Sequence, residues 1–252
     1  MKLILTGVTG AAGIQIFRQA ITDAAITKIT VLSRRALPTW MDVPQNDKTE
    51  VIVLQDFLNY PSDLPARLGE HDACIWALGK SSVGLSEEEY TKITYDYTMT
   101  FAKQIQPFTR ARTAGPFTFV FISGEGADQT EKSSLLFARI KGRTEKALLD
   151  LPPEANIRTH ILRPAYFFPS KHHPSDRVNI RSSTARALDA IAAPIISTMI
   201  PSHFTPIDDL GLFAVGTAKG MWADEHLFRN TRMRQLLRQF PRADGSERKT
   251  SC

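Results

Sequence analysis

The sequence predicts an α/β protein whose central sheet is parallel and covered by helices on both faces. Short apolar runs alternate with stretches of helical periodicity along most of the 252 residues, which is the pattern of repeated β-α-β units. The strand-like runs are continuously apolar, so we expect both faces of each strand to be buried. A composition of 42% hydrophobic and 23% charged residues is that of an ordinary globular protein with a large core, and it excludes fibrous and wholly disordered classes.

Six apolar runs are the expected strands of this doubly wound sheet. They lie at residues 2–6, 28–32, 50–54, 73–77, 117–122 and 159–162. Between them, apolar residues at helical spacing predict helices at residues 14–25, 87–105 and 133–149.

After Pro164 the alternation of strands and helices becomes irregular. We expect residues 165–240 to contribute a small helical cap over the substrate, with an irregular loop at 169–183 and helices near 184–193, 208–219 and 224–240. The last helix has apolar residues at i, i+3, i+4 and i+7, namely Met233, Leu236, Leu237 and Phe240. Residues 1–240 are thus expected to form a single domain, followed by a disordered basic tail at 241–252.

A glycine-rich turn stands directly after the first expected strand and directly before the first expected helix. It reads TGVTGAAG over residues 6–13, which is the spacing and the context of a dinucleotide-binding turn. Gly7 permits a sharp turn, Gly10 lets backbone amides approach a pyrophosphate, and Gly13 allows the helix to pack closely on the strand. The sequence therefore predicts a bound dinucleotide, with Thr9 and Ala12 among its contacts.

The residues after the second expected strand indicate which dinucleotide is bound. An acid at this place binds the ribose hydroxyls of NAD, but the chain has Ser33, Arg34 and Arg35. A hydroxyl and a guanidinium group suit the 2′-phosphate of NADP, so we expect NADP as the cofactor, with Ser33 and Arg34 as contacts. The alternative is that the arginines are solvated surface residues. Asp56 and Phe57, after the third strand, are expected to flank the adenine.

Several short motifs occur in an order that resembles a known family. They are the turn at 6–13, Leu32-Ser33-Arg34-Arg35, Trp76-Ala77-Leu78-Gly79, Ser123-Gly124, Lys141-Gly142 and Leu162-Arg163-Pro164. Over roughly residues 1–220 the chain is similar to the atypical short-chain dehydrogenase/reductases, in particular to Tat-interacting oxidoreductase-like proteins and fungal nucleoside-diphosphate-sugar epimerase-like proteins. The resemblance implies an NAD(P)-binding Rossmann domain in which Ala77, Leu78, Gly79 and Pro164 also contact the cofactor.

The resemblance also implies a catalytic site, and the chain departs from it at one position. Active relatives carry a Tyr-x-x-x-Lys pair on the helix after strand five, with both side chains on one helical face, and a serine at the end of that strand. The matching segment here is FARIK, residues 137–141, so Phe137 stands where a tyrosine would exchange a proton with the substrate. Lys141 is expected to hold the nicotinamide ribose and Ser123 to donate to a carbonyl oxygen.

Two classes of function follow. The first is an NADP-dependent oxidoreductase for a small carbonyl or alcohol, whose proton comes from water, Ser123 or a displaced tyrosine; Tyr166 is the leading candidate, with Tyr90 and Tyr95 as others. The second is a protein that binds NADP without redox turnover, as a sensor or interaction module, or as a catalyst of isomerisation or cyclisation.

Charge and cysteine usage lead to expectations about partners and location. The net charge is +5, but residues 228–252 hold seven Arg and Lys against two acids, so the remaining body is neutral. We therefore expect a small-molecule substrate and no nucleic-acid or membrane partner. The two cysteines and the His172-His173 pair lack metal-ligand spacing, so no metal is expected. We expect a cytoplasmic location, and a homodimer by analogy with the family.

Overall fold

A single parallel sheet forms the centre of the computed structural model, which describes residues 1–187, 189–190 and 201–239. Its seven strands have the order β3-β2-β1-β4-β5-β6-β7, and each neighbouring pair is parallel. The strands are β1 (Lys2–Thr6), β2 (Lys28–Ser33), β3 (Thr49–Val53), β4 (Ala73–Trp76), β5 (Phe117–Ile122), β6 (Ile157–Arg163) and β7 (Leu227–Arg229). The predicted doubly wound fold is confirmed.

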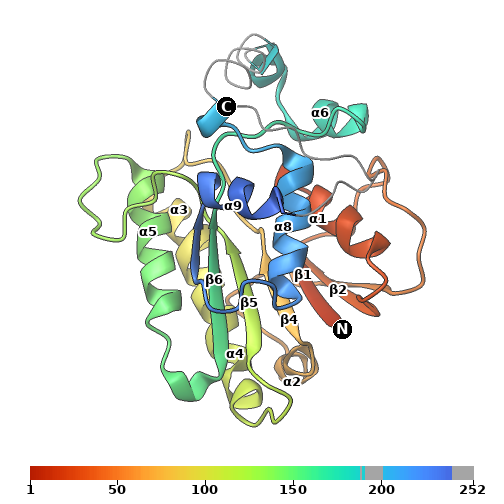
Figure 1. The fold of residues 1–252 in the computed structure, drawn as a ribbon, viewed down its shortest axis with the longest axis vertical. Helices are drawn as coiled ribbons and strands as arrows, with labels where there is room; N and C mark the ends of the chain where they lie inside the picture. The colour runs from red at the N-terminus through yellow and green to blue at the C-terminus, as the bar shows by residue number, and fades with distance from the viewer. Residues whose placement is uncertain (188, 191–200, 240–252) are drawn as a thin grey trace.

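Helices cover both faces of this sheet, as the continuously apolar strands predicted. The helical segments are α1 (Ala11–Thr22), α2 (Leu64–Gly69), α3 (Glu87–Thr91), η1 (Lys92–Asp96), α4 (Tyr97–Arg110), α5 (Leu136–Leu149), η2 (Pro153–Ala155), α6 (Pro174–Ile180), η3 (Pro201–His203), α8 (Ile207–Ala218) and α9 (Asn230–Leu237). Helices α1, α8 and α9 share one core with the sheet, and α2, α4 and α5 share the other. Figure 1 shows the sheet between these two layers, with α6 above the end of the sheet at which the strands finish.

The strand order places a topological switch point between β1 and β4. The chain winds outward from β1 to β3 and then returns to the other side of β1 to form β4. Loops that leave β1 and β4 therefore diverge to opposite faces of the sheet, and this leaves a crevice at the carboxyl ends of the two strands. The glycine-rich turn that follows β1 lies at this crevice.

The helix expected over residues 87–105 is not continuous. A capping box between Ser86 and Glu89 starts α3, a π-helical turn follows as η1, and α4 then extends to Arg110 with Pro107 inside it. Because a π-helical turn has no sequence signature in hydrophobic spacing, the interruption could not be predicted from periodicity.

The C-terminal region contributes more to the main body than the predicted cap would. Helix α8 packs on α1 and on the sheet. The helix expected at 224–240 is instead strand β7 followed by α9, because Phe228 is fully buried at the sheet edge and β7 pairs with β6. Phe240 and the tail at 241–252 lie outside the described residues.

One part of the predicted cap is present above the crevice. The segment at 169–183, expected to be an irregular loop, contains α6. Asp176 of α6 forms a buried bidentate ion pair with Arg18 of α1, with oxygen-to-nitrogen distances of 2.5 and 2.9 Å. Of the helix expected near 184–193, residues 183–187 and 189–190 are helical and the remainder lies outside the described residues. The ion pair fastens α6 to the body of the domain.

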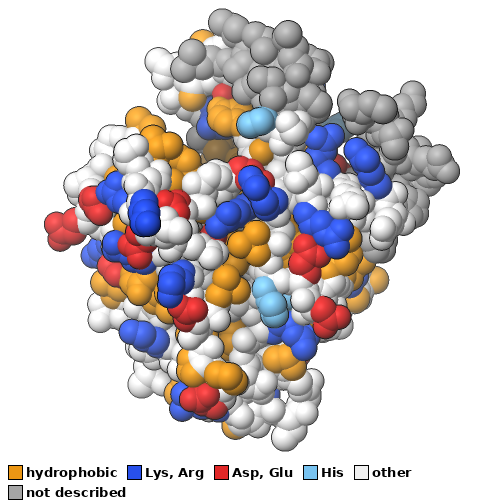
Figure 2. Space-filling model, turned by 60° about the vertical axis from the view of Figure 1, so that its left-hand side comes forward, with side chains coloured by type: hydrophobic (Ala, Val, Ile, Leu, Met, Phe, Trp, Pro, Cys, Tyr) orange, Lys and Arg blue, Asp and Glu red, His pale blue; other side chains and the backbone are white. Residues whose placement is uncertain are grey.

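The surface mixes charges of both signs. On the face shown in Figure 2, Lys and Arg side chains alternate with Asp and Glu, without a broad area of one sign. Within the described part of the chain, no helix has the length and apolar character needed to cross a bilayer.

Candidate functional site

The glycine-rich turn is built on two contacts that only glycine permits. Gly7 has φ of +69°, and a Cβ there would lie 2.3 Å from the carbonyl oxygen of Ala77. A Cβ on Gly13 would lie 2.0 Å from the carbonyl oxygen of Gly7. The turn, the loop after β4 and the start of α1 therefore approach more closely than any side chain allows. Gly10 differs, because a Cβ there would meet only Gly7, at 3.4 Å.

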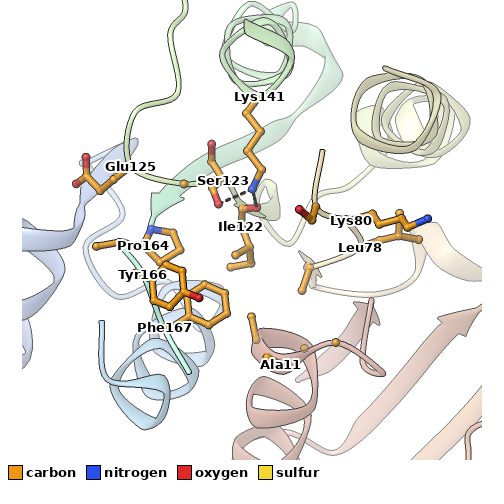
Figure 3. Close-up of a pocket in the computed structure, with 18 of the residues that line it drawn as sticks. Ala11, Leu78, Lys80, Ile122, Ser123, Glu125, Lys141, Pro164, Tyr166 and Phe167 are labelled. Atoms are coloured by element: carbon orange, nitrogen blue, oxygen red, sulfur yellow. Dashed lines mark hydrogen bonds between the residues drawn. The ribbon is translucent and has the colours of Figure 1, made fainter. Parts of the chain in front are cut away.

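A cavity of about 760 Å³ opens above this turn. Figure 3 shows Ala11 and Lys141 on opposite sides of it, with Leu78 and Tyr166 on the two remaining sides. The predicted site residues that line it are Gly10, Ala12, Gly13, Ala77, Leu78, Gly79, Ser123, Lys141, Pro164 and Tyr166. Predicted residues that are not in its lining are Gly7, Thr9, Ser33, Arg34, Asp56 and Phe57.

The residues expected to select NADP lie at the end of β2, beside the glycine turn. Strand β2 pairs with β1 in register, Thr6 opposite Leu32, so Ser33 and the turn share one edge of the sheet. Ser33 is half-buried, its hydroxyl accepts a 3.5 Å bond from the Arg35 amide, and Arg34 is exposed. Residues 33–35 contain no acid.

Phe57 is not placed to flank an adenine, which corrects the prediction. Its ring is fully buried beneath the sheet edge, in edge-to-face contact with Trp76 at 5.7 Å and tilted contact with Tyr97 at 5.7 Å. Asp56 turns its carboxylate toward its own loop, where it accepts bonds from the Leu58 amide at 3.0 Å and the Asn59 side chain at 2.7 Å. Both residues therefore stabilise the loop after β3. The sequence did not show this, because an aromatic residue after a strand can belong to a core as well as to a binding site.

Ser123 lies at the end of β5, as predicted, but its hydroxyl is already used. It donates to the carboxylate of Glu145, which is fully buried on α5. Glu145 also accepts two bonds from the guanidinium of Arg163, at 2.9 and 2.5 Å, and one from Gln129 at 2.9 Å. The hydroxyl cannot donate to a substrate carbonyl without giving up its bond to Glu145, so the role expected for Ser123 requires a rearrangement.

Lys141 extends from α5 into the cavity. Its Nζ donates to the main-chain oxygens of Ser123 at 2.7 Å and Ile122 at 3.4 Å, as the dashed lines in Figure 3 mark. Enclosure by the protein lowers the pKa of this amine to about 8, against the opposing effect of the Glu145 charge. Lys141 is thus held at the carboxyl end of β5 with its amine open to a ligand.

Phe137 lies one helical turn before Lys141, as the FARIK spacing predicted. The tip of its ring lies beside Gly126, 3.6 Å from where a Cβ would be, and Phe137 is outside the cavity lining. No hydroxyl therefore stands at this position of α5.

Tyr166 borders the cavity from the loop after β6. Its hydroxyl donates to the carboxylate of Asp189 at 3.0 Å, and Asp189 is paired with Arg181 at 3.2 Å. The guanidinium of Arg181 also lies 5.8 Å from the centre of the Tyr166 ring. Burial raises the pKa of the Tyr166 phenol, Arg181 opposes this, and the bond to Asp189 adds to it.

Three residues near the site were missed by sequence reasoning. Glu145 follows Lys141 by four positions, and this i, i+4 spacing could have indicated a shared helical face. Arg181 and His203 line the cavity from the C-terminal region, where the sequence has no motif and only the tertiary fold brings them to the crevice.

Comparisons with known proteins place the chain among fungal relatives. No family model matches the sequence. Leucinostatins biosynthesis cluster protein T of Purpureocillium lilacinum is 29% identical over 161 residues, which are 64% of this chain and 56% of that protein. Protein fmp52, mitochondrial, of Emericella nidulans is 35% identical over 65% of each chain. Botcinic acid biosynthesis cluster B protein 16 of Botryotinia fuckeliana is 34% identical over 47% of this chain and 77% of that protein. The match thus spans less than two thirds of the first two relatives.

Solved structures share the fold at low identity. A 3-oxoacyl-[acyl-carrier protein] reductase from Brucella melitensis, in complex with NAD, has a TM-score of 0.62 and 16% identity over 91% of this chain and 95% of its own. The RhlG/NADP complex of Pseudomonas aeruginosa has a TM-score of 0.61 and 17% identity over 90% of this chain and 94% of its own. The first structure contains NAD and the second contains NADP.

The relatives also correct one expectation. The predicted cytoplasmic location is wrong on this comparison, because relatives from Emericella nidulans, Scheffersomyces stipitis, Aspergillus niger and Eremothecium gossypii are all named as mitochondrial proteins.

Proposed function

We propose that the chain is an NADP-dependent oxidoreductase of the atypical short-chain dehydrogenase/reductase type, acting on a small carbonyl or alcohol. Solved structures of short-chain dehydrogenase/reductases share its fold, which supports the proposal. The observation that supports the proposal most strongly is the glycine turn, in which Gly7 and Gly13 exclude any Cβ while Gly10 faces the cavity. This is a cradle for a pyrophosphate at the N-terminus of α1.

The residues around the cavity fit a nicotinamide dinucleotide. The turn after β1 would hold the pyrophosphate, Ser33 and Arg34 the 2′-phosphate, and the loop at 77–79 with Pro164 the nicotinamide half. Lys141 would lie beside the adjoining ribose, with one N–H of its amine directed into the cavity. The bound cofactor supplies hydride chemistry, and the protein supplies orientation and exclusion of water.

The cavity is lined by the apolar side chains of Leu78, Ile122, Phe167 and Ile180 above the glycine turn, which favours a small, mainly apolar carbonyl compound. Two relatives are named for leucinostatin and botcinic acid biosynthesis, so we propose a role in modifying a small metabolite.

A homodimer is proposed by analogy with the family, and a single domain over residues 1–240 is proposed from the shared sheet.

A second function is supported by a different observation. Phe137 has no exchangeable proton, and the Ser123 hydroxyl is committed to Glu145. Both facts favour a protein that retains NADP without redox turnover, as a sensor or as a catalyst of isomerisation or cyclisation.

The consumption of NADPH separates the two functions. The purified chain is incubated with NADPH and a panel of aldehydes and ketones, and absorbance of the reduced cofactor is followed. The oxidoreductase proposal expects steady consumption with at least one carbonyl, and slower consumption with NADH. Saturable NADPH binding without consumption on any member of a broad panel would contradict it and support the second function.

A further inference from the structure

We propose that Lys141 is the catalytic acid of this chain and gives its own proton to the oxygen of the substrate carbonyl. The inference rests on the oxidoreductase function proposed above. It assigns the proton transfer to an amine of the chain at a site where Phe137 offers no hydroxyl.

The hydrogen bonds of Lys141 leave one proton for this role. An ammonium group has three donors, and two of them are directed to the main-chain oxygens of Ser123 and Ile122. Among the described residues no third acceptor contacts Nζ, while Lys141 lines the cavity. A neutral amine has two N–H donors and one lone pair, so loss of the third proton leaves both bonds to the main chain in place.

The charges around Lys141 let it exchange that proton near neutral pH. No carboxylate of the described chain is paired with its amine, because the Glu145 oxygens are taken by Ser123, Gln129 and Arg163. The ammonium is therefore enclosed without a counterion, and its pKa falls to about 8. A general acid works best when its pKa lies close to the working pH.

Other proton donors at the cavity are less suitable. The Ser123 hydroxyl donates to Glu145, and the Tyr166 hydroxyl donates to the carboxylate of Asp189. A phenol that donates to a carboxylate holds its proton more firmly. His203 lines the cavity but is exposed, with its Nδ1 3.1 Å from the Ser202 hydroxyl, so it is the remaining competitor.

The step balances as a two-electron reduction. The carbonyl carbon receives a hydride, with its electron pair, from the reduced nicotinamide. The π electrons of the carbonyl move to oxygen, and this oxygen takes the proton from Nζ of Lys141. An alcohol, an oxidised nicotinamide and a neutral amine result, and the amine regains a proton from water through the open cavity.

A labelling experiment on the unmodified chain tests the amine without any turnover. The protein is treated with trace acetic anhydride between pH 6 and 11, and acetylation of each lysine is measured by peptide mass spectrometry. Lys141 is expected to gain reactivity with a midpoint near 8. The internal control is Lys146, on the same helix and paired with Asp150, whose midpoint should lie above about 10. A Lys141 midpoint equal to that of Lys146, or no label at Lys141, would overturn the proposal.

Steady-state kinetics test the proton transfer itself. Lys141→Arg keeps the positive charge and the donors, but arginine does not release a proton in proteins. We expect kcat for carbonyl reduction to fall by about 100-fold or more, while the Kd for NADPH stays within about fivefold, since fivefold is only about 1 kcal/mol. The rate of the wild-type protein should decline as the pH rises through about 8, where the acid is deprotonated. Lys146→Arg is the matched control and should leave kcat unchanged.

The outcomes distinguish this inference from the function on which it rests. If wild-type protein consumes NADPH and Lys141→Arg does so within threefold of its rate, the function stands and the inference fails. If His203→Gln, but not Lys141→Arg, removes the alkaline decline, the histidine is the acid and the inference is again wrong. If wild-type protein binds NADPH and consumes none, the oxidoreductase function itself fails, whatever the labelling midpoint.

Discussion

The two sides of the cavity differ in the atoms that form them, main chain on one side and long side chains on the other. The side formed by the turn after β1 is made of main chain, with Gly7 and Gly13 packed so tightly that a Cβ would overlap a carbonyl oxygen. The opposite side is made of long side chains, with Lys141, Tyr166 and Arg181 reaching in from α5 and from the region after β6. The main-chain side depends on the absence of a Cβ at a few positions within one turn. The side-chain side depends on contacts between residues far apart in the sequence.

Gly13→Ala, on the main-chain side, should have the largest combined effect, because it should lower stability and also abolish cofactor binding. The new Cβ would lie 2.0 Å from the Gly7 oxygen. The backbone fixes the position of a Cβ and the Gly7 oxygen is itself a backbone atom, so no rotamer change can relieve the clash. We expect a loss of about 3 kcal/mol in the free energy of unfolding and loss of NADPH binding. Urea unfolding and NADPH fluorescence measure the two effects.

Gly10→Ala is the control for that variant. Its Cβ would meet only Gly7, at 3.4 Å, so the free energy of unfolding should change by about 1 kcal/mol or less, although the methyl group would face the cavity. Equal destabilisation by the two substitutions would contradict the difference between these glycines.

Glu145→Ala tests the buried contacts of Glu145 with Ser123 and Arg163, on the side-chain side of the cavity. The substitution leaves the Arg163 guanidinium, only 14% exposed, without its buried partner, which costs about 3–5 kcal/mol in comparable pairs. Chemical denaturation should show a loss of this size.

The exposed pair between Glu87 and Arg139 provides a comparison. It has side-chain exposures of 55% and 24%, and Glu87→Ala should cost about 1 kcal/mol or less. A Glu145→Ala variant as stable as Glu87→Ala would show that the network around Ser123 does not support the fold.

Arg34→Ala sharpens the account of cofactor choice on the main-chain side. Loss of a charged hydrogen bond to the 2′-phosphate removes about 1.5–3 kcal/mol, so the Kd for NADPH should rise by about 10- to 100-fold. The Kd for NADH should stay the same because NADH has no phosphate at this position. Parallel fluorescence titrations measure both constants, and an equal change for the two nucleotides would remove Arg34 from the phosphate site.

Tyr166→Phe should have the smallest effect. Its hydroxyl is bonded to Asp189, so its removal should change kcat by no more than about threefold, well below the effect of losing a general acid. Steady-state rates of carbonyl reduction measure this. A fall of 100-fold would identify Tyr166, and not Lys141, as the proton donor.

The same contrast explains what could be predicted from the sequence. The glycine turn and the strands were predictable because each depends on local spacing, and Lys141 was predictable through the resemblance of residues 137–141 to the Tyr-x-x-x-Lys segment of the family. Phe57 was misplaced because an aromatic residue after a strand can serve a core as well as a site. The spacing of Glu145 from Lys141 could indicate a shared helical face, but not its bond to Ser123. The bond of Tyr166 to Asp189 was equally unpredictable, since both pairs meet only when the chain folds over the sheet. Strand β7 was missed because three residues are too few for a periodicity to be recognised.

The most direct test of the account is calorimetric titration of the wild-type protein with NADPH, with NADH run in parallel. The glycine turn and the arginine beside it predict one saturable site per chain for NADPH and weaker binding of NADH. Absence of any binding heat for either nucleotide, over temperatures at which the protein is folded, would contradict the claim that this turn holds a nicotinamide dinucleotide.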